Sequence, residues 1–250
     1  MNKYILGKQL FQNIFELQDY PDIIAKKYKT PLYRKQEEKR LLSIQSIENV
    51  PRILYSTQHT IYMHKIPGED LFRVIKKKKR LPEKECRLIA YNLLRIVKEI
   101  HECGIVHGDI KPENIMYNEY SHEITLIDFE SDRHSEHYRS PESYFQKNKT
   151  QSDDIWCIGS TIYTLLMGHN PYNNRDHMFS GLSYHPMDDK GLSPIAIDFV
   201  QKLLSWDYKL RPSIEYCLKH PWVSHDVIMP IEIESEYKEK DKIWSCCVIL

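Results

Sequence analysis

The hydrophobic pattern changes along the chain. Over residues 1 to about 66, short apolar runs such as residues 23–27 and 61–66 alternate with polar turns, which predicts strands, and residues 36–44 predict one helix. Between residues 86 and 100 apolar side chains recur every three or four positions, and Gly104 ends this predicted helix. Residues 154–167 are apolar nearly all round, which predicts a central helix. The pattern therefore predicts a strand-rich first part and a helical second part.

Two apolar runs in the middle of the chain end in polar side chains. The first leads into a tight loop that carries Asp109, Lys111 and Asn114, and the second ends at Asp128. A base, a cation and two hard oxygen ligands that converge on one cleft suit phosphoryl transfer from a metal-bound nucleotide.

Composition narrows the function classes. Lys and Arg together number 35, as do Asp and Glu, so the net charge favours neither nucleic acid nor bulk acidic partners. The six cysteines show no metal-ligand spacing, which favours a reduced intracellular compartment. We expect no N-terminal signal peptide and no transmembrane span, because no apolar run is long enough.

The polar loops resemble the catalytic loop and metal-binding turn of eukaryotic-type protein kinases, H-R-D-x-K-x-x-N and D-F-G, with Gly108 in place of the Arg and Glu130 in place of the Gly. The resemblance implies an α+β fold of two lobes, a small β-rich N-lobe with one main helix and a larger helical C-lobe. It places the kinase domain at residues 4–224, with the N-lobe at 4–63, the hinge at 64–68 and the C-lobe at 69–224. A flexible tail, residues 225–250, follows.

The resemblance also implies a reaction, with ATP and Mg²⁺ as cofactors and proteins as substrates. Asp109 orients the substrate hydroxyl and accepts its proton, and Lys111 neutralises charge on the moving γ-phosphoryl. Asn114 and Asp128 hold Mg²⁺. A lysine two residues after the base resembles serine/threonine kinases. Ser135 fills the Thr position of the T-x-x-Y-x-A-P-E segment on which the substrate backbone docks.

The nucleotide pocket is implied by weaker likenesses in the N-lobe. Of the phosphate-covering pattern G-x-G-x-x-G-x-V only Gly7 is kept, and Ile14 is the apolar lid over adenine. Residues 23–27 resemble V-A-I-K. A register that puts Ala25 against the base makes Lys27 the phosphate-binding ammonium and turns Lys26 to the other face.

The helix at residues 36–44 should supply the acid that pairs with this lysine. Helical spacing to Leu42, one turn on, favours Glu38 as the partner of Lys27, with Glu37 as the alternative.

The connection between the lobes completes the implied pocket. Met63 lies at its back, the backbones of His64 and Ile66 bond adenine, and Asp70 reaches the ribose. The resemblance assigns two further residues after the catalytic loop to nucleotide binding, Glu113 and Met116. Glu113 and Asp70 together would also favour basic residues upstream of the target hydroxyl.

The helical part has a cation run whose role is left open and two implied structural contacts. The run of five cations at residues 76–80 is typical of a solvated loop, with docking to anionic lipid or nuclear import as alternatives. By the same resemblance Asp154 is a buried helix acid and Arg211 is the ion-pair partner of Glu142.

The departures from the family pattern bear on activity. Gly108 removes the arginine that holds a phosphate on the activation segment, and only fourteen positions separate Asp128 from Glu142, so we expect no switching by phosphorylation there. Glu130 narrows the backbone freedom of the metal-binding turn and either locks Asp128 inward or spoils the site. With the missing phosphate-loop glycines, this leaves a pseudokinase scaffold as the alternative to an active kinase.

The last residues predict a lipid anchor. Residues 247–250 fit C-a-a-X in its geranylgeranyl form, with Cys247 as the prenylated residue. One lipid alone binds membranes reversibly, so we expect palmitoylation of Cys246 as a second signal. The expected location is the cytoplasmic face of a membrane. The sequence leaves the oligomeric state open, and no nucleic-acid partner is expected.

Overall fold

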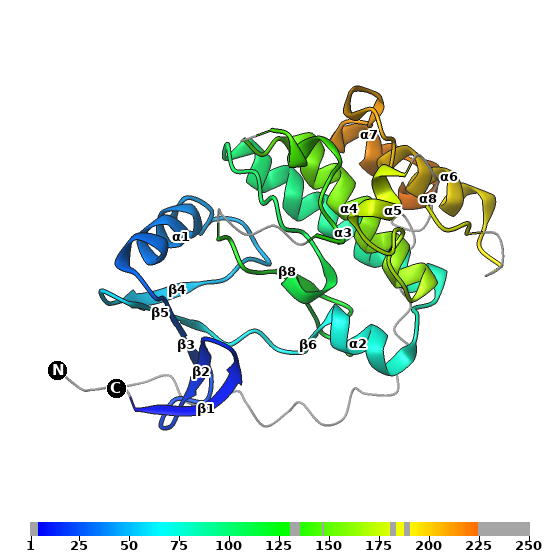
Figure 1. Ribbon diagram of the computed structural model, residues 1–250. Helices are drawn as coiled ribbons and strands as arrows, with labels where there is room; N and C mark the ends of the chain where they lie inside the picture. Colours follow the sequence, from blue (N-terminus) through cyan, green and yellow to red (C-terminus); the bar gives the residue numbers. More distant parts are fainter. Residues whose placement is uncertain (1–4, 131–135, 147, 181–183, 188–190, 225–250) are drawn as a thin grey trace.

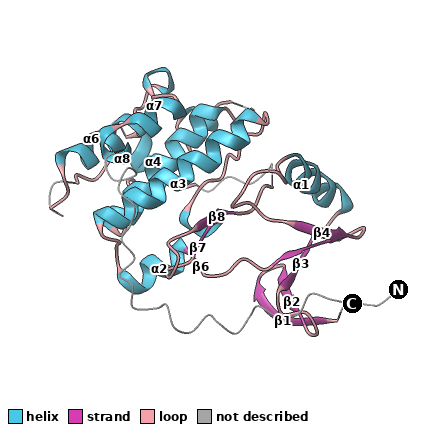
Figure 2. Cartoon of the chain, turned by 180° about the vertical axis from the view of Figure 1, so that it is seen from behind, coloured by secondary structure: helices cyan, strands magenta, loops and turns pink. Residues whose placement is uncertain are grey.

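The computed structural model describes residues 5–130, 136–146, 148–180, 184–187 and 191–224. Cys246, Cys247 and Ser135 therefore lie outside the described residues. Figures 1 and 2 show two lobes, a strand-rich one built from the first part of the chain and a helical one built from the rest. The predicted α+β class with a β-rich N-lobe and a helical C-lobe is confirmed.

The N-lobe is a five-stranded sheet with one helix. The strands follow the order β1-β2-β3-β5-β4, and every neighbouring pair is antiparallel. Their bounds are β1 Leu6–Phe11, β2 Ile14–Leu17, β3 Ile23–Lys27, β4 Ile53–Ser56 and β5 Thr60–His64. The helix, α1, spans Pro31–Ser43 and contacts β5.

Helix α1 begins five residues before the predicted segment. Thr30 is its N-cap, where the Thr30 hydroxyl accepts a hydrogen bond from the Tyr33 N–H, and Pro31 occupies the first helical position. Proline is favoured there because its missing N–H would have no partner in the first turn. Glu37 and Leu41, one turn apart on this helix, are buried.

The C-lobe is built from helices around a small sheet. Its helices are α2 Leu71–Lys78, α3 Glu83–Glu102, α4 Gln151–Met167, α5 Arg175–Phe179, α6 Pro194–Leu203, α7 Ile214–Lys219 and α8 Pro221–Ser224. The sheet joins β6 Glu69–Asp70, β7 Ile115–Tyr117 and β8 Ile124–Leu126. Short 3₁₀ turns lie at η1 Pro112–Asn114, η2 Glu142–Tyr144 and η4 Tyr208–Leu210.

Helix α4 is the centre of the C-lobe, as its all-round apolar sequence predicts. Every residue from Asp153 to Met167 is buried, and the helix packs against α3 and α6. Thr150 caps it, and Asp153 completes a capping box by accepting hydrogen bonds from the Thr150 backbone and hydroxyl. No helix in the described ranges is both long enough and apolar enough to cross a membrane.

An ion pair joins Glu142, in η2, to Arg211 near the end of the C-lobe. Arg211 donates from Nη1 and Nη2 to the two carboxylate oxygens of Glu142, at 2.5 and 2.8 Å. Its guanidinium also lies over the ring of Trp156, 4.8 Å from the centroid. The predicted pairing of Arg211 with Glu142 is confirmed, and its bidentate form is the strong one for these groups.

Candidate active site

The polar loop between α3 and β7 brings three predicted side chains together. Lys111 Nζ donates to Asp109 Oδ2 at 2.8 Å, and Asn114 Nδ2 donates to the Asp109 carbonyl at 2.8 Å and to Oδ2 at 3.1 Å. Asp109 is 3% exposed. Its carboxylate is therefore held in one orientation by a cation on one side and an amide on the other.

A buried acid in α4 holds the backbone of this loop. Asp154 is fully buried and accepts hydrogen bonds from the His107 N–H at 2.9 Å, from the Gly108 N–H at 2.6 Å and from His101 Nε2 at 2.7 Å. Two backbone donors on one carboxylate fix the chain just before Asp109. The implied role of Asp154 as a buried helix acid is thus visible in its contacts.

His107 links this loop to the one that carries Asp128. Its Nδ1 accepts from the Asp109 N–H at 3.2 Å, its Nε2 faces the Ile127 carbonyl at 3.1 Å, and its ring packs edge-on against Phe129. Burial lowers the pKa of His107 despite the nearby Asp154. The neutral tautomer with its proton on Nε2 satisfies both contacts, so the imidazole acts as a spacer between the two loops.

Lys149 occupies the space beside the position where the family pattern has arginine. Gly108 has φ +74°, and a Cβ at Gly108 would collide with the Lys149 side chain. Burial lowers the pKa of Lys149, against the influence of Asp109. A larger residue at Gly108 would require Lys149 to move. Independence from phosphorylation of the activation segment stays a prediction, because residues 131–135 lie outside the described ranges.

The N-lobe lysine that pairs with an acid of α1 is Lys26, so the predicted pairing of Lys27 with Glu38 is wrong. Lys26 Nζ donates to both carboxylate oxygens of Glu37, at 2.9 and 2.8 Å, and to Asp128 Oδ1 at 2.6 Å. Glu37, the alternative partner in the sequence, is the acid of the pair. Tyr28 supports it by donating from its hydroxyl to Glu37 Oε2 at 2.7 Å.

Strand alternation gives the physical reason for the shift by one residue. In β3 Lys26 is 4% exposed, whereas Lys27 is exposed and lies over the ring of Phe15, 5.4 Å from its centroid. Ala25 shares the face of Lys27, because side chains two residues apart share a face. Ile24, and not Ala25, therefore shares the face of Lys26.

The faces of α1 explain the acid in the same way. Glu37 and Leu41 are buried, whereas Leu42, which was expected to pack behind the acid, is 57% exposed. Glu38 faces elsewhere and is bound by Arg34 and the Ser56 hydroxyl. Spacing from Glu37 to the apolar pair Leu41 and Ile44 was the signal for the correct face, since residues four and seven apart share it.

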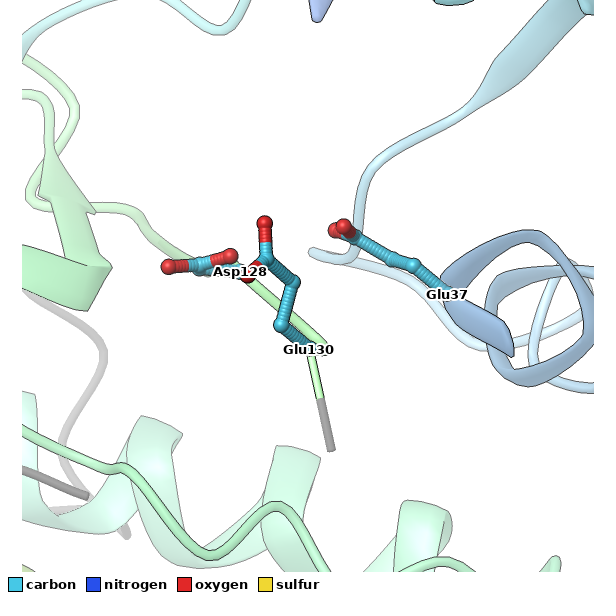
Figure 3. A group of neighbouring side chains, drawn as sticks. All are labelled: Glu37, Asp128 and Glu130. Atoms are coloured by element: carbon cyan, nitrogen blue, oxygen red, sulfur yellow. The ribbon is translucent and has the colours of Figure 1, made fainter. Parts of the chain in front are cut away.

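Three carboxylates surround this one ammonium. Figure 3 shows Glu37 reaching from α1 toward Asp128 and Glu130 on the loop after β8, and their oxygens lie within 4.8 Å of one another. Glu130 Oε1 lies 3.2 Å from Lys26 Nζ, farther than the other two acids. Burial opposes the charge of Lys26, but Glu37, Asp128 and Glu130 outweigh it and raise the pKa of Lys26 above its usual value. Lys26 therefore stays charged.

The donors on the C-lobe side fit the implied Mg²⁺. Asn114 uses Nδ2 for its bonds to Asp109, which leaves Oδ1 as an acceptor for another group. Asp128 adds a carboxylate, and the cluster around Lys26 holds more acids than cations. Magnesium prefers hard oxygen ligands of this kind.

Two of the remaining predicted nucleotide residues share a sheet face with Lys26. Ile14 pairs with Lys26 and Met63 pairs with Ile24 across the sheet, so both share the face of the lysine. At the hinge, the His64 N–H donates to the Arg52 carbonyl at 3.1 Å. Because this N–H is already used, it is not the group that would bond adenine. Ile66 lies two residues later in the chain. Met116, in β7, pairs with Asp70.

Two of these residues have structural partners of their own. Asp70 caps α2 by accepting from the Arg73 N–H at 2.9 Å, and its other oxygen lies 3.1 Å from Arg73 Nε. A ribose contact would be additional to both. Gly7 lies in β1, where a Cβ would come within 3.3 Å of the Glu16 carbonyl oxygen.

A side chain closes the hairpin between β1 and β2. Gln9 Nε2 donates to the Gln12 carbonyl at 2.7 Å across the hairpin tip, and Phe11 is 55% exposed there. Glutamines thus stand where the family pattern has glycines whose backbone approaches phosphate.

Comparison with known proteins identifies the family of this chain. A family model described as the protein kinase domain matches residues 25–223. Hormonally up-regulated neu tumor-associated kinase homolog A from Xenopus laevis is 32% identical over 231 residues, which is 81% of this chain and 33% of that protein. Death-associated protein kinase dapk-1 from Caenorhabditis elegans is 32% identical over 183 residues, 65% of this chain and 13% of that protein. The chain spans about a third or less of the length of these relatives.

A solved structure supports the architecture. The Cydia pomonella granulovirus kinase PK-1 superposes with a TM-score of 0.73 at 21% identity, over 88% of this chain and 95% of that one. At this identity the likeness concerns the fold, which is the two-lobed arrangement implied by the sequence.

Proposed function

We propose, from the premise that the chain belongs to the protein kinase family, that it transfers the γ-phosphoryl group of Mg-ATP to serine or threonine hydroxyls of proteins. The observation that carries this proposal is the joint placement of two clusters. Asp109, Lys111 and Asn114 form one, and Lys26, Glu37 and Asp128, drawn from both lobes, form the other.

The side chains divide the reaction between them. Asp109, oriented by Lys111 and Asn114, accepts the proton of the substrate hydroxyl as its oxygen attacks the γ-phosphorus. Lys26 exchanges part of its carboxylate contact for the α- and β-phosphates of ATP, and Glu37 keeps it aimed. Lys111 lies beside Asp109 and neutralises charge on the transferred group.

Asn114 and Asp128 would hold Mg²⁺. When bound, the ion neutralises phosphate charge and fixes the leaving-group oxygens. Because Asp128 also contacts Lys26 at 2.6 Å, the same carboxylate joins the metal side of the cleft to the lysine side.

A phosphoryl-transfer assay tests the proposal. Purified protein with Mg²⁺ and labelled ATP should phosphorylate itself or a panel of Ser- and Thr-containing peptides, and hydrolysis should yield phosphoserine or phosphothreonine. Asp128→Ala should reduce the transfer below detection, because it removes both a proposed Mg²⁺ ligand and a carboxylate that contacts Lys26. Transfer that survives Asp128→Ala at the original rate would contradict the assigned roles.

A pseudokinase that binds partners is the second candidate, and the contacts of Lys26 favour it. Three carboxylates already surround this ammonium, so phosphate must compete with them. The hairpin tip is closed by glutamine and offers no glycine backbone to phosphate. A thermal shift on adding ATP, with no transfer to any peptide, would select this candidate.

Glu130 can be tested apart from the remaining acids. We expect Glu130→Gly to change kcat/KM by no more than about threefold, since Glu37 and Asp128 hold Lys26 at shorter distances than Glu130 does. Peptide phosphorylation at saturating ATP measures the effect. Glu130→Gln, which keeps the Cβ and removes the charge, separates backbone freedom from charge. A gain of more than tenfold in either variant would make Glu130 an inhibitory residue.

Membrane attachment is the second part of the proposal. It rests on Cys247 and the three residues after it, provided that Leu250 is the last residue of the protein in the cell. Prenylation of Cys247 and palmitoylation of Cys246 would place the kinase at the cytoplasmic face of a membrane, because two lipids give stable attachment.

Fractionation of eukaryotic cells tests the anchor. The full chain should sediment with membranes, and Cys247→Ser should move most of it to the soluble fraction. Cys246→Ser should weaken attachment while mass spectrometry still finds the prenyl group. Equal partitioning of Cys247→Ser and the parent would refute the anchor and leave the kinase proposal untouched.

A further inference from the structure

A cavity lies beside the loop that carries Asp109, since Glu113 is among its wall residues. It has a volume of about 1230 Å³ and is lined by α2, by the end of α4 and by the segment that follows α4. We call it the α2 cavity; its polar lining includes Lys76, Lys79, Glu113, His137 and His169. Lys26, Asp109 and Asp128 are not among the described residues that line it, so these side chains proposed for the reaction lie outside this cavity.

Glu113 joins the cavity to the reacting centre. It lies in η1 between Asp109 and Asn114 in sequence, and its Oε2 is buried without a hydrogen-bond partner among the described residues. Tyr138, on the segment where a substrate backbone is expected to dock, is another wall residue. A peptide in the α2 cavity therefore lies next to the loop that would receive its hydroxyl.

The cations of residues 76–80 divide into two sets. Lys77 pairs with Glu69 at 2.5 Å and Lys78 pairs with Glu119 at 3.2 Å, both outside the cavity. Lys76 and Lys79 line the cavity, and neither has an ion-pair partner within the described ranges. Both ammonium groups are therefore part of the described cavity wall.

The acids that would favour a basic substrate are neutralised or outnumbered. Asp70 is bound by Arg73 and Glu69 by Lys77. Glu113 is the one acid among the residues described as lining the cavity, against two lysines. Of the two acids that were expected to select basic residues, Asp70 is therefore neutralised by Arg73, and Glu113 remains.

Apolar side chains supply the rest of the wall. The cavity wall also holds Phe72 and Ile75 from α2, and Met167 and Tyr172 from α4 and the segment after it. Gly168 allows the ends of α2 and α4 to approach each other, because a Cβ there, at φ +82°, would collide with the Lys79 carbonyl. The arrangement suits a peptide whose anionic groups meet lysines while its backbone and apolar atoms cover aromatic rings.

We infer that the α2 cavity binds the substrate segment next to the target hydroxyl and selects anionic side chains through Lys76 and Lys79. This inference rests on the proposed kinase function and specifies its substrate class. Carboxylates of Asp or Glu and the phosphate of a phosphoserine share the required chemistry.

Peptides that differ only in charge test the inference. A serine in an alanine-rich peptide would be flanked by Glu, by neutral Gln, by Lys or by phosphoserine. We expect kcat/KM for the Glu peptide to exceed that for the Lys peptide by about tenfold or more, mainly through KM, because opposite charges steer and hold the peptide. A larger preference for phosphoserine would identify phosphate as the favoured anion.

Charge reversal then locates the selection. Lys76→Glu with Lys79→Glu should raise KM for the Glu peptide about tenfold and leave that for the Gln peptide within about twofold. Lys77→Glu is the matched control, since it makes the same change in charge on the same helix outside the cavity. Melting temperature and activity on the Gln peptide establish that the variants are folded.

The outcomes separate the two proposals. If no peptide is phosphorylated, the kinase function fails; binding of labelled Glu peptide with Ala at the target position still tests the cavity by fluorescence anisotropy. If Gln or Lys peptides are phosphorylated as well as the Glu peptide, the inference is refuted while the function stands. An equal effect of Lys77→Glu would show a general field rather than this cavity.

Discussion

Replacing Lys26 by methionine is expected to lower kcat/KM for peptide phosphorylation by about 10²–10³-fold, as loss of one preorganised charge contact to a reacting group does. The same replacement at Lys27 should change it less than about twofold. Lys26 is buried between Glu37 and Asp128, whereas Lys27 is exposed and lies over Phe15. Steady-state rates of the two variants, side by side, decide which lysine binds phosphate.

Folding must be measured in the same variants. Removing Lys26 leaves Glu37 and its two neighbouring acids without their shared cation, which is destabilising for buried charges. Lys26→Met combined with Glu37→Gln lowers that repulsion and should recover stability in urea unfolding without recovering activity. A larger loss of activity from Lys27→Met than from Lys26→Met would return the assignment to Lys27.

The error of one residue at this lysine shows what the sequence can determine. Alternation in residues 23–27 indicates that Lys26 and Lys27 lie on opposite faces, but it does not say which face the cleft takes. That choice is made by pairing with β2 and β5, where Lys26 stands opposite Ile14 and Ile61. The partner acid was misassigned together with the lysine. Glu37 and Glu38 are adjacent on α1, and the spacing from Glu37 to Leu41 and Ile44, rather than that from Glu38 to Leu42, marks the buried face.

The catalytic-loop motif in the C-lobe was predictable because its residues are close together in the sequence. The spacing of Asp109, Lys111 and Asn114 within one short loop brings them together in any fold that keeps the loop. The contact of Arg211 with Glu142 spans 69 residues and was accessible only through the family resemblance. The α2 cavity was not accessible at all, since its lysines differ from Lys77 and Lys78 only in their partners.

Asp109→Asn is expected to lower kcat by about 10³-fold with little change in ATP affinity. General-base catalysis contributes about 10²–10⁴-fold, and an amide cannot accept the hydroxyl proton. Asp109 contacts Lys111 and Asn114, whereas Lys26 contacts Glu37 and Asp128, so the contacts that Lys26 would make with the nucleotide should survive the replacement of Asp109.

The fold should tolerate this change, which makes the result interpretable. Asparagine is nearly the same size as aspartate, and its side-chain oxygen can still accept the bonds from Lys111 and Asn114. The backbone of the loop is held separately by Asp154 through the N–H groups of His107 and Gly108. Single-turnover rates and ATP-induced thermal shifts, measured on one preparation, should therefore diverge: the transfer rate is lost and the thermal shift is kept.

Two other outcomes are informative. If both the transfer rate and the thermal shift are kept, Asp109 is not the base. If both are lost, the variant reports on the integrity of the loop, and Asp109→Glu, which restores a carboxylate at a different reach, then distinguishes the effect of charge from that of placement. Recovery of nucleotide binding without recovery of transfer in Asp109→Glu would assign Asp109 its chemical role, whereas recovery of both would contradict the requirement for the short, oriented side chain.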